Sequence, residues 1–232
     1  MNPLTNGQMS ESEKGKLRFI LGFSVFFVAL WLLWDTPAVY PLKIFVVLLH
    51  EASHAIAVVV SGGTLDRITL DPRQGGATYF SNGNAILALS AGYLGSLAWG
   101  GLMFSAARTK WIRTDWMNGL IGGLVVLLTV FYVRGAFGIT FGVLFGLAMI
   151  TASRKIGPAM NRHLLVTLGL TSALYAVLDI KSDILDRPEL QSDAHMLAEA
   201  TGIGTTTMWG AIWITIAVAF CAWLLRWAYR EA

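Results

Sequence analysis

The sequence predicts an all-α, polytopic membrane protein, and three observations indicate this class. Hydrophobic residues make up 55% of the 232 residues, whereas charged residues make up only 13%. The mean hydropathy is +0.61, and apolar runs of membrane length recur along the chain. The net charge of +3 is modest and the basic residues lie at the ends of these runs, so nucleic acid is not an expected partner.

Apolar runs define the expected helices. Residues 1–17 are a polar tail, and the run over 18–34 is long, aromatic and not followed by a small-residue cleavage pattern, so we interpret it as a retained span. Further spans are expected as follows: 41–60, 84–107, 116–133, 135–152, 162–180 and 207–227. This gives seven spans in one domain over 18–232.

Six spans are the alternative, because only Arg134-Gly135 separates two of the runs, which could form a tight hairpin or one bent segment. Lys and Arg divide almost equally between the two sides of the membrane, so the positive-inside rule predicts no orientation. The sequence also predicts no oligomeric state.

The segment 62–84 differs from the apolar runs around it. Two arms, Leu65–Leu70 and Ala77–Phe80, flank a centre rich in turn residues, Asp71-Pro72-Arg73-Gln74-Gly75-Gly76. We expect a short β-hairpin at the membrane boundary, with an irregular loop as the alternative.

Small residues recur at four-residue spacing in two of the expected spans, and such ridges let neighbouring helices approach closely. One ridge holds Gly92, Ser96 and Gly100, and the other holds Gly138, Gly142 and Gly146. Neither contains an ionisable group, so both are interpreted as packing surfaces.

The stretch His50-Glu51-Ala52-Ser53-His54 places three ionisable groups inside an apolar run. Such groups are costly at membrane depth and usually mark a site. On a helix, His50 and His54 share one face, so both imidazoles can bind one metal ion. Glu51 projects beside them and suits the role of general base on a zinc-bound water, because zinc lowers the pKa of bound water to about 7. The alternative is a polar cluster that only bridges helices.

Two histidines leave room for a third protein ligand. Asp179 is preferred because it directly follows an apolar run, where a lone carboxylate is costly unless a cation faces it. Asp183, one helical turn further, is the alternative. Asp183, Asp186 and Asp193 are otherwise interpreted as solvated loop residues, and His163 and His195 as interfacial residues.

Three segments resemble the site-2 protease family of intramembrane zinc metallopeptidases, in particular its short bacterial branch. HEASH resembles the zinc-binding helix of the family, Ala91–Ser96 resembles its second core helix, and Leu178-Asp179 resembles its third. The resemblance covers about 41–206 as the core. It implies zinc bound by His50, His54 and Asp179, and Glu51 as the catalytic residue.

The resemblance also implies a multi-pass protein of the bacterial plasma membrane. We expect an intramembrane zinc metalloprotease that hydrolyses peptide bonds of membrane-embedded or juxtamembrane substrates, with the lipid bilayer and a membrane protein or peptide as its partners. Ser96 could hydrogen-bond the substrate or pack between helices. A catalytically silent, zinc-binding membrane scaffold is the alternative, and an ion carrier is a third hypothesis, although the discontinuous spans expected of a carrier are not evident.

Overall fold

The computed structural model describes residues 9–34, 36–186 and 191–232. Two compact units are described, each by itself. One holds the first helix with the last residues of the chain, 219–232, and the other covers 41–218. The predicted tail over 1–17 and single domain over 18–232 stay predictions, although a helix already begins at Glu11, where Ser10 and Glu13 form a capping box.

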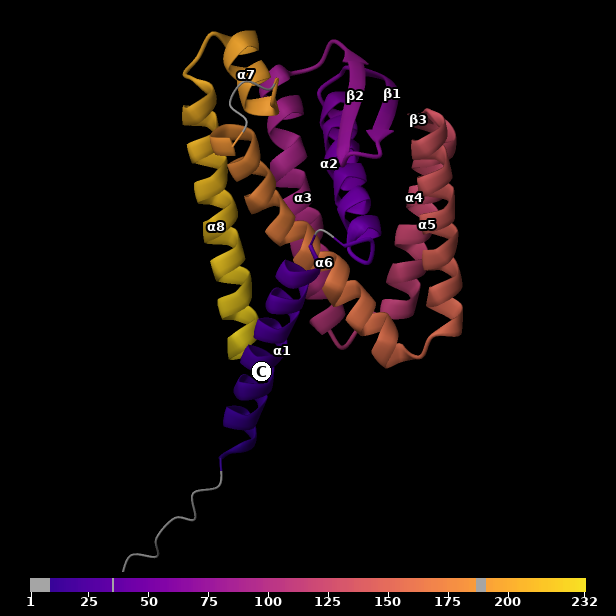
Figure 1. Cartoon of the computed structure of the whole chain (residues 1–232), viewed down its shortest axis with the longest axis vertical. Helices are drawn as coiled ribbons and strands as arrows, with labels where there is room; N and C mark the ends of the chain where they lie inside the picture. The colour runs from indigo at the N-terminus through magenta and orange to yellow at the C-terminus, as the bar shows by residue number, and fades with distance from the viewer. Residues whose placement is uncertain (1–8, 35, 187–190) are drawn as a thin grey trace, which may run out of the picture. The chain divides into compact units, whose positions relative to one another are not determined.

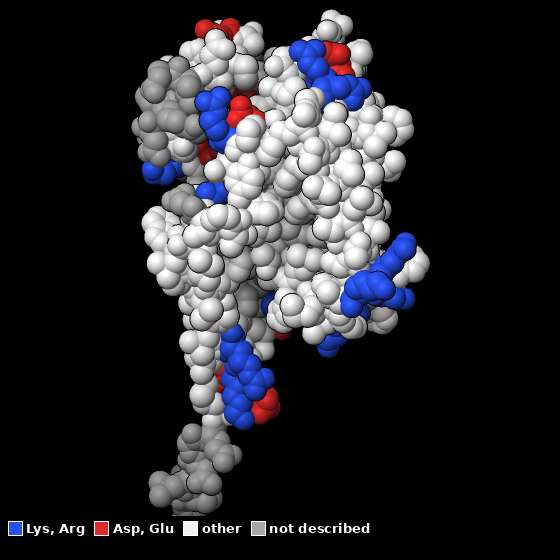
Figure 2. All heavy atoms as spheres, turned by 45° about the vertical axis from the view of Figure 1, so that its right-hand side comes forward, with Lys and Arg blue, Asp and Glu red and all other residues white. Residues whose placement is uncertain are grey.

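The seven predicted spans are confirmed as helices. Among the described residues, seven helices are long and apolar enough to cross a membrane (Figure 1). They are α1 (Glu11–Leu33), α2 (Tyr40–Val60), α3 (Ala85–Arg108), α4 (Thr114–Tyr132), α5 (Ala136–Lys155), α6 (Pro158–Lys181) and α8 (Thr206–Arg230). On the face shown in Figure 2, Lys and Arg side chains gather at a few places and leave broad stretches of helical surface without charge, as expected for helices surrounded by lipid.

The predicted β-hairpin is also confirmed. Strands β1 (Thr64–Asp71) and β2 (Gly75–Ser81) are antiparallel, with Ile68 opposite Thr78 and Leu70 opposite Gly76. A third strand, β3 (Val133–Arg134), was not expected and pairs in parallel with β1, so the strand order is β2–β1–β3.

Residues 133–135 also decide between the six-span and seven-span alternatives. Gly135 follows β3 with a φ of +89°, a conformation that glycine adopts without a steric penalty. It allows α4 and α5 to form the tight helical hairpin, rather than one bent segment.

Small residues set the helix packing inside 41–218. A Cβ atom added at Gly100 of α3 would lie 2.7 Å from the carbonyl oxygen of Gly169 of α6, and one added at Gly122 of α4 would lie 2.6 Å from that of Gly146 of α5. The helices of these two pairs therefore approach backbone to backbone. This bears out the packing interpretation at Gly100 and Gly146, and Gly92 is described below with the residues that it contacts.

Two polar features complete this unit. Nδ2 of the buried Asn118 of α4 donates to both the carbonyl oxygen and the Oδ1 atom of Asn161 of α6. After α6 comes a short π-helical turn, Ser182–Asp186, and then α7 (Asp193–Thr201), a helix that the sequence did not predict. The hydroxyl of Ser192 caps α7 at its N-terminus, and α7 packs against α3.

Candidate metal centre

His50 and His54 lie on consecutive turns of α2, as the sequence predicts. The residues between Tyr40 and Val60 are apolar enough to form one continuous helix, so positions four apart share a face. The two ring centroids lie 4.7 Å apart, and the side chain of His54 is only 6% exposed. Two imidazoles therefore meet in a site that solvent barely reaches.

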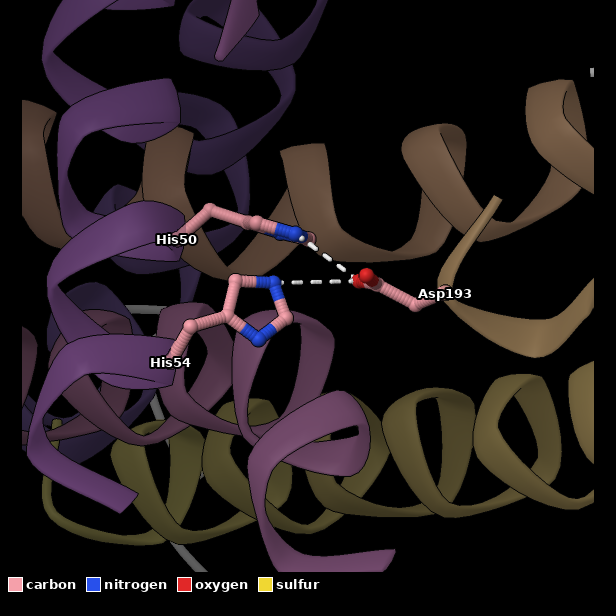
Figure 3. Close-up of side chains that lie close together, drawn as sticks. All are labelled: His50, His54 and Asp193. Atoms are coloured by element: carbon pink, nitrogen blue, oxygen red, sulfur yellow. Dashed lines mark hydrogen bonds and ion pairs between the residues drawn. The ribbon is translucent and has the colours of Figure 1, made fainter. Parts of the chain in front are cut away.

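Asp193 faces both histidines from the start of α7 (Figure 3). Its Oδ2 atom lies 3.0 Å from Nε2 of His50 and 3.2 Å from Nε2 of His54. One ligand atom from each of the three residues lies within 4.8 Å of the other two. Three potential metal ligands therefore converge on one small volume.

The opposite nitrogens of the two rings contact other groups. Nδ1 of His54 is 2.7 Å from the carbonyl oxygen of Ala88 on α3, and Nδ1 of His50 is 3.8 Å from Oδ2 of Asp179 on α6. A carbonyl or carboxylate at the second nitrogen is the usual outer partner of a histidine that binds a metal. Both Nε2 atoms face Asp193, and in His54 the hydrogen bond at Nδ1 holds the ring in this orientation.

Gly92 of α3 leaves the space in front of the two Nε2 atoms open. A Cβ atom at this position would lie in impossible contact with Nε2 of both His50 and His54. Gly92 therefore lets α3 lie close to α2, as expected of the ridge, and the groups that it lies against are the two imidazoles.

The donor set fits zinc. Two imidazole nitrogens and one carboxylate oxygen are typical ligands of a catalytic zinc site, which keeps its fourth position open. Ligands of tetrahedral zinc lie about 3.3 Å apart, close to the observed Nε2–Oδ2 distances. Burial alone would raise the pKa of the Asp193 carboxyl group, but the charges and hydrogen bonds of His54 and His50 outweigh burial and lower this pKa. The charge effect is that of protonated histidines, and a bound zinc ion would take their place as the cation that favours the carboxylate form of Asp193.

Glu51, the expected general base, is also buried, with 5% of its surface exposed. The Thr78 hydroxyl lies 2.7 Å from its Oε2 atom and donates a hydrogen bond to it. Strand β2 of the hairpin therefore reaches the residue beside His50.

The aspartates around the site lie differently from the sequence expectations. Asp179 was expected as the third ligand, and the structure places it at the Nδ1 side of His50 instead of among the three converging ligands. Asp183 accepts a hydrogen bond from the hydroxyl of Tyr93 at 2.5 Å.

Asp193 was interpreted as a solvated loop residue, and this interpretation is wrong, because Asp193 is buried at the start of a helix. A signal was present in the sequence. Ser192 before Asp193 and Gly202 after Thr201 are typical N-terminal and C-terminal boundaries of a short helix.

Three other residues singled out from the sequence lie outside the cluster. Ser96 is buried and its hydroxyl donates to the carbonyl oxygen of Gly92, one turn earlier on α3, which favours its packing role. His163 is exposed near the start of α6. His195 lies on α7, and its Nε2 atom is 3.4 Å from Oε1 of Glu199.

The comparison with protein families gives one clear result. The model of the family described as Peptidase M50B-like matches residues 23–224, which is most of the chain. Neither the search of curated proteins nor the search of solved structures gave a match. The matched region contains both histidines, Glu51 and Asp193, and it agrees with the resemblance to site-2 proteases. The chain therefore belongs to the Peptidase M50B-like family, within the site-2 proteases.

Proposed function

We propose that this protein is a zinc-dependent endopeptidase that cleaves peptide bonds within or beside the membrane, with Glu51 as its general base. The observation that carries the proposal is the convergence of His50, His54 and Asp193 in a buried site beside Glu51, in a chain of membrane-length helices. The bacterial plasma membrane, inferred from the family resemblance, is the proposed location.

His50, His54 and Asp193 would hold the zinc ion. When bound, zinc acts as a Lewis acid on the scissile carbonyl group and makes a water molecule nucleophilic near neutral pH. Asp193 is proposed as the third ligand because its Oδ2 atom meets both Nε2 atoms. Asp179 is proposed as the outer partner of His50, because its carboxylate lies 3.8 Å from Nδ1, the ring nitrogen opposite the one that faces Asp193.

Glu51 would move the protons of the reaction. Its carboxylate accepts a proton as the attacking water adds to the carbonyl carbon, and passes that proton to the leaving amine nitrogen as the peptide C–N bond breaks. Its burial excludes bulk water, which strengthens these interactions.

The hairpin offers an edge for a substrate in the extended conformation. Strand β1 lies between β2 and β3, so we assign the pairing to β2, the outer strand of the hairpin. A peptide bond inside a helix must be unwound before cleavage, and pairing with an edge strand would hold it extended. An open hollow lined by Gly76, Ala77 and residues of β1 lies on the hairpin, and Gly76 also contacts Glu51.

The experiment is a cleavage assay of the full chain in lipid nanodiscs with a model transmembrane substrate, together with zinc analysis. Wild-type protein should contain one zinc ion and cleave. Glu51→Gln should keep zinc and lose at least about 100-fold in kcat, because the amide cannot accept a proton. Glu199→Gln is the matched control, because Glu199 is exposed on α7, away from the converging ligands.

Two outcomes would contradict the proposal. Turnover that is unchanged in Glu51→Gln removes Glu51 as the base. Stoichiometric zinc in a wild-type protein that cleaves no tested substrate favours the scaffold, in which zinc serves only the fold.

A further inference from the structure

We propose that Thr78, together with the bare backbone at Gly76, positions the carboxylate of Glu51, so that strand β2 sets the geometry of the general base. This inference rests on the proposed function. Thr78 is a positioning residue and acts on the reaction only through Glu51.

The first observation is a close pair of contacts from one hydroxyl group. Oγ1 of Thr78 lies 2.7 Å from Oε2 of Glu51 and 3.0 Å from the main-chain carbonyl oxygen of the same residue. The hydroxyl has one proton, and a bond to a carboxylate is roughly twice as strong as one between neutral groups. Thr78 therefore joins β2 to the Glu51 side chain and leaves Oε1 to accept a proton.

The second observation is the absence of a side chain at Gly76. A Cβ atom there would lie 2.6 Å from Oε1 and 2.7 Å from Cγ of Glu51. Gly76 and Thr78 are two residues apart, so they lie on one face of β2. The carboxylate is therefore enclosed between a hydrogen-bond donor and a stretch of backbone that lies against it.

The strand that carries both contacts is itself held in place. Gly76 pairs with Leu70 and Thr78 pairs with Ile68, and the exposed fractions of Leu70 and Ile68 are 8% and 0%. Because these two residues are buried, a slip of the register would expose apolar surface and is opposed. The fixed register keeps the Thr78 hydroxyl at Glu51.

Positioning of this kind affects rate more than binding. A misplacement of about 1 Å at a reacting group can cost on the order of 100-fold in rate. Without the hydroxyl of Thr78, the side chain of Glu51 gains freedom to rotate, whereas the main-chain edge of β2 remains. The loss should therefore fall on kcat, with KM nearly constant.

The test compares Thr78→Val, Thr78→Ser and Thr129→Val in the zinc-loaded full chain. Thr129 is the control because its hydroxyl also donates to a carbonyl oxygen, that of Val125 on its own helix, and Thr129 is buried whereas Thr78 is half-buried. Thr78→Val should lower kcat about 10- to 100-fold with zinc content unchanged, Thr78→Ser should restore most of it, and Thr129→Val should match wild type. Equal kcat in Thr78→Val and wild type would overturn the inference.

A second readout needs no turnover. Acetohydroxamic acid chelates zinc and donates a hydrogen bond to a neighbouring carboxylate, so its affinity reports the position of Glu51. Thr78→Val and Glu51→Gln should each weaken binding about five- to tenfold, and the double variant should bind no more weakly than Glu51→Gln alone. Additive losses would show that Thr78 does not act through Glu51.

The two readouts separate this inference from the proposed function. Coupled hydroxamate binding in a protein that cleaves nothing supports the positioning role and contradicts the peptidase. Cleavage that is insensitive to Thr78→Val supports the peptidase and contradicts the positioning role. Absence of both cleavage and zinc-dependent hydroxamate binding in the wild-type protein contradicts both.

Discussion

The Nδ1 atom of His54 lies 2.7 Å from the main-chain carbonyl oxygen of Ala88. A carbonyl oxygen can only accept, so Nδ1 of His54 carries the proton in this contact. Nε2 of the neutral ring then keeps its lone pair, and this atom faces Asp193. One hydrogen bond between α2 and α3 therefore selects the tautomer that a metal requires.

Replacement of either histidine should release the metal. In His54→Ala or His50→Ala, two protein ligands remain, and zinc affinity should fall at least about 100-fold. This loss exceeds the one expected when an outer partner of a ligand is replaced, which lowers metal affinity about 10- to 100-fold. Competition with a chelator during zinc analysis measures this. His163→Ala, altered at an exposed position on α6, should keep wild-type affinity, and stoichiometric zinc in the double variant of His50 and His54 would refute the site.

The two aspartates should differ in the size of their effect. Asp193→Asn replaces a converging ligand and should reduce zinc affinity more than about 100-fold, whereas Asp179→Asn alters an outer partner 3.8 Å from His50 and should cost about tenfold. Zinc titration of both variants checks the ranking. The reverse order would assign the third ligand to Asp179, as the sequence suggested.

Most of the fold could be predicted from the sequence because lipid restricts the possible structures. A backbone in hydrocarbon must satisfy its own hydrogen bonds, so each long apolar run implies a helix. The β-hairpin could also be predicted, because residues typical of turns separate two short arms of strand-forming residues. The β3 strand could not be predicted, because Val133 and Arg134 pair with Ile68 and Thr69 of β1 only through tertiary packing.

The candidate site was predictable where its residues are close in sequence. His50 and His54 share a face of one helix, so spacing alone brings them together. Asp193 lies 143 residues after His50, and only the packing of α7 against α3 brings it to the histidines. The polar composition of α7 concealed it, because charged residues near a span end are usually solvated.

Asn118 should contribute to stability without affecting the metal. Its Nδ2 atom donates twice to Asn161, and both residues are fully buried. Asn118→Ala leaves these acceptors without that donor and should destabilise the protein by about 1–3 kcal/mol. Thr171→Val is the opposite case, because the Thr171 hydroxyl has no hydrogen-bond partner among the described residues, so this variant should be neutral or stabilising. Thermal unfolding of both variants in one detergent measures the difference. Equal losses of stability in the two variants would contradict the stabilising role assigned to Asn118.

Gly92→Ala should abolish metal binding through one added methyl group. The new Cβ atom would lie in impossible contact with Nε2 of both His50 and His54, so either the methyl group fills the metal position or α3 moves away from α2. In both cases zinc content should fall below about a tenth of the wild-type value, because the converging ligands can no longer approach one ion.

Gly123→Ala is the control for this substitution, because Gly123 lies inside α4 and a Cβ atom there meets nothing within 4 Å. That variant should keep its zinc and gain up to about 1 kcal/mol from the better helix propensity of alanine. Zinc analysis and thermal unfolding of both variants separate a blocked site from a general loss of folding. If Gly92→Ala binds zinc as tightly as Gly123→Ala does, the metal does not lie between the two imidazoles and α3, and the site proposed above is wrong.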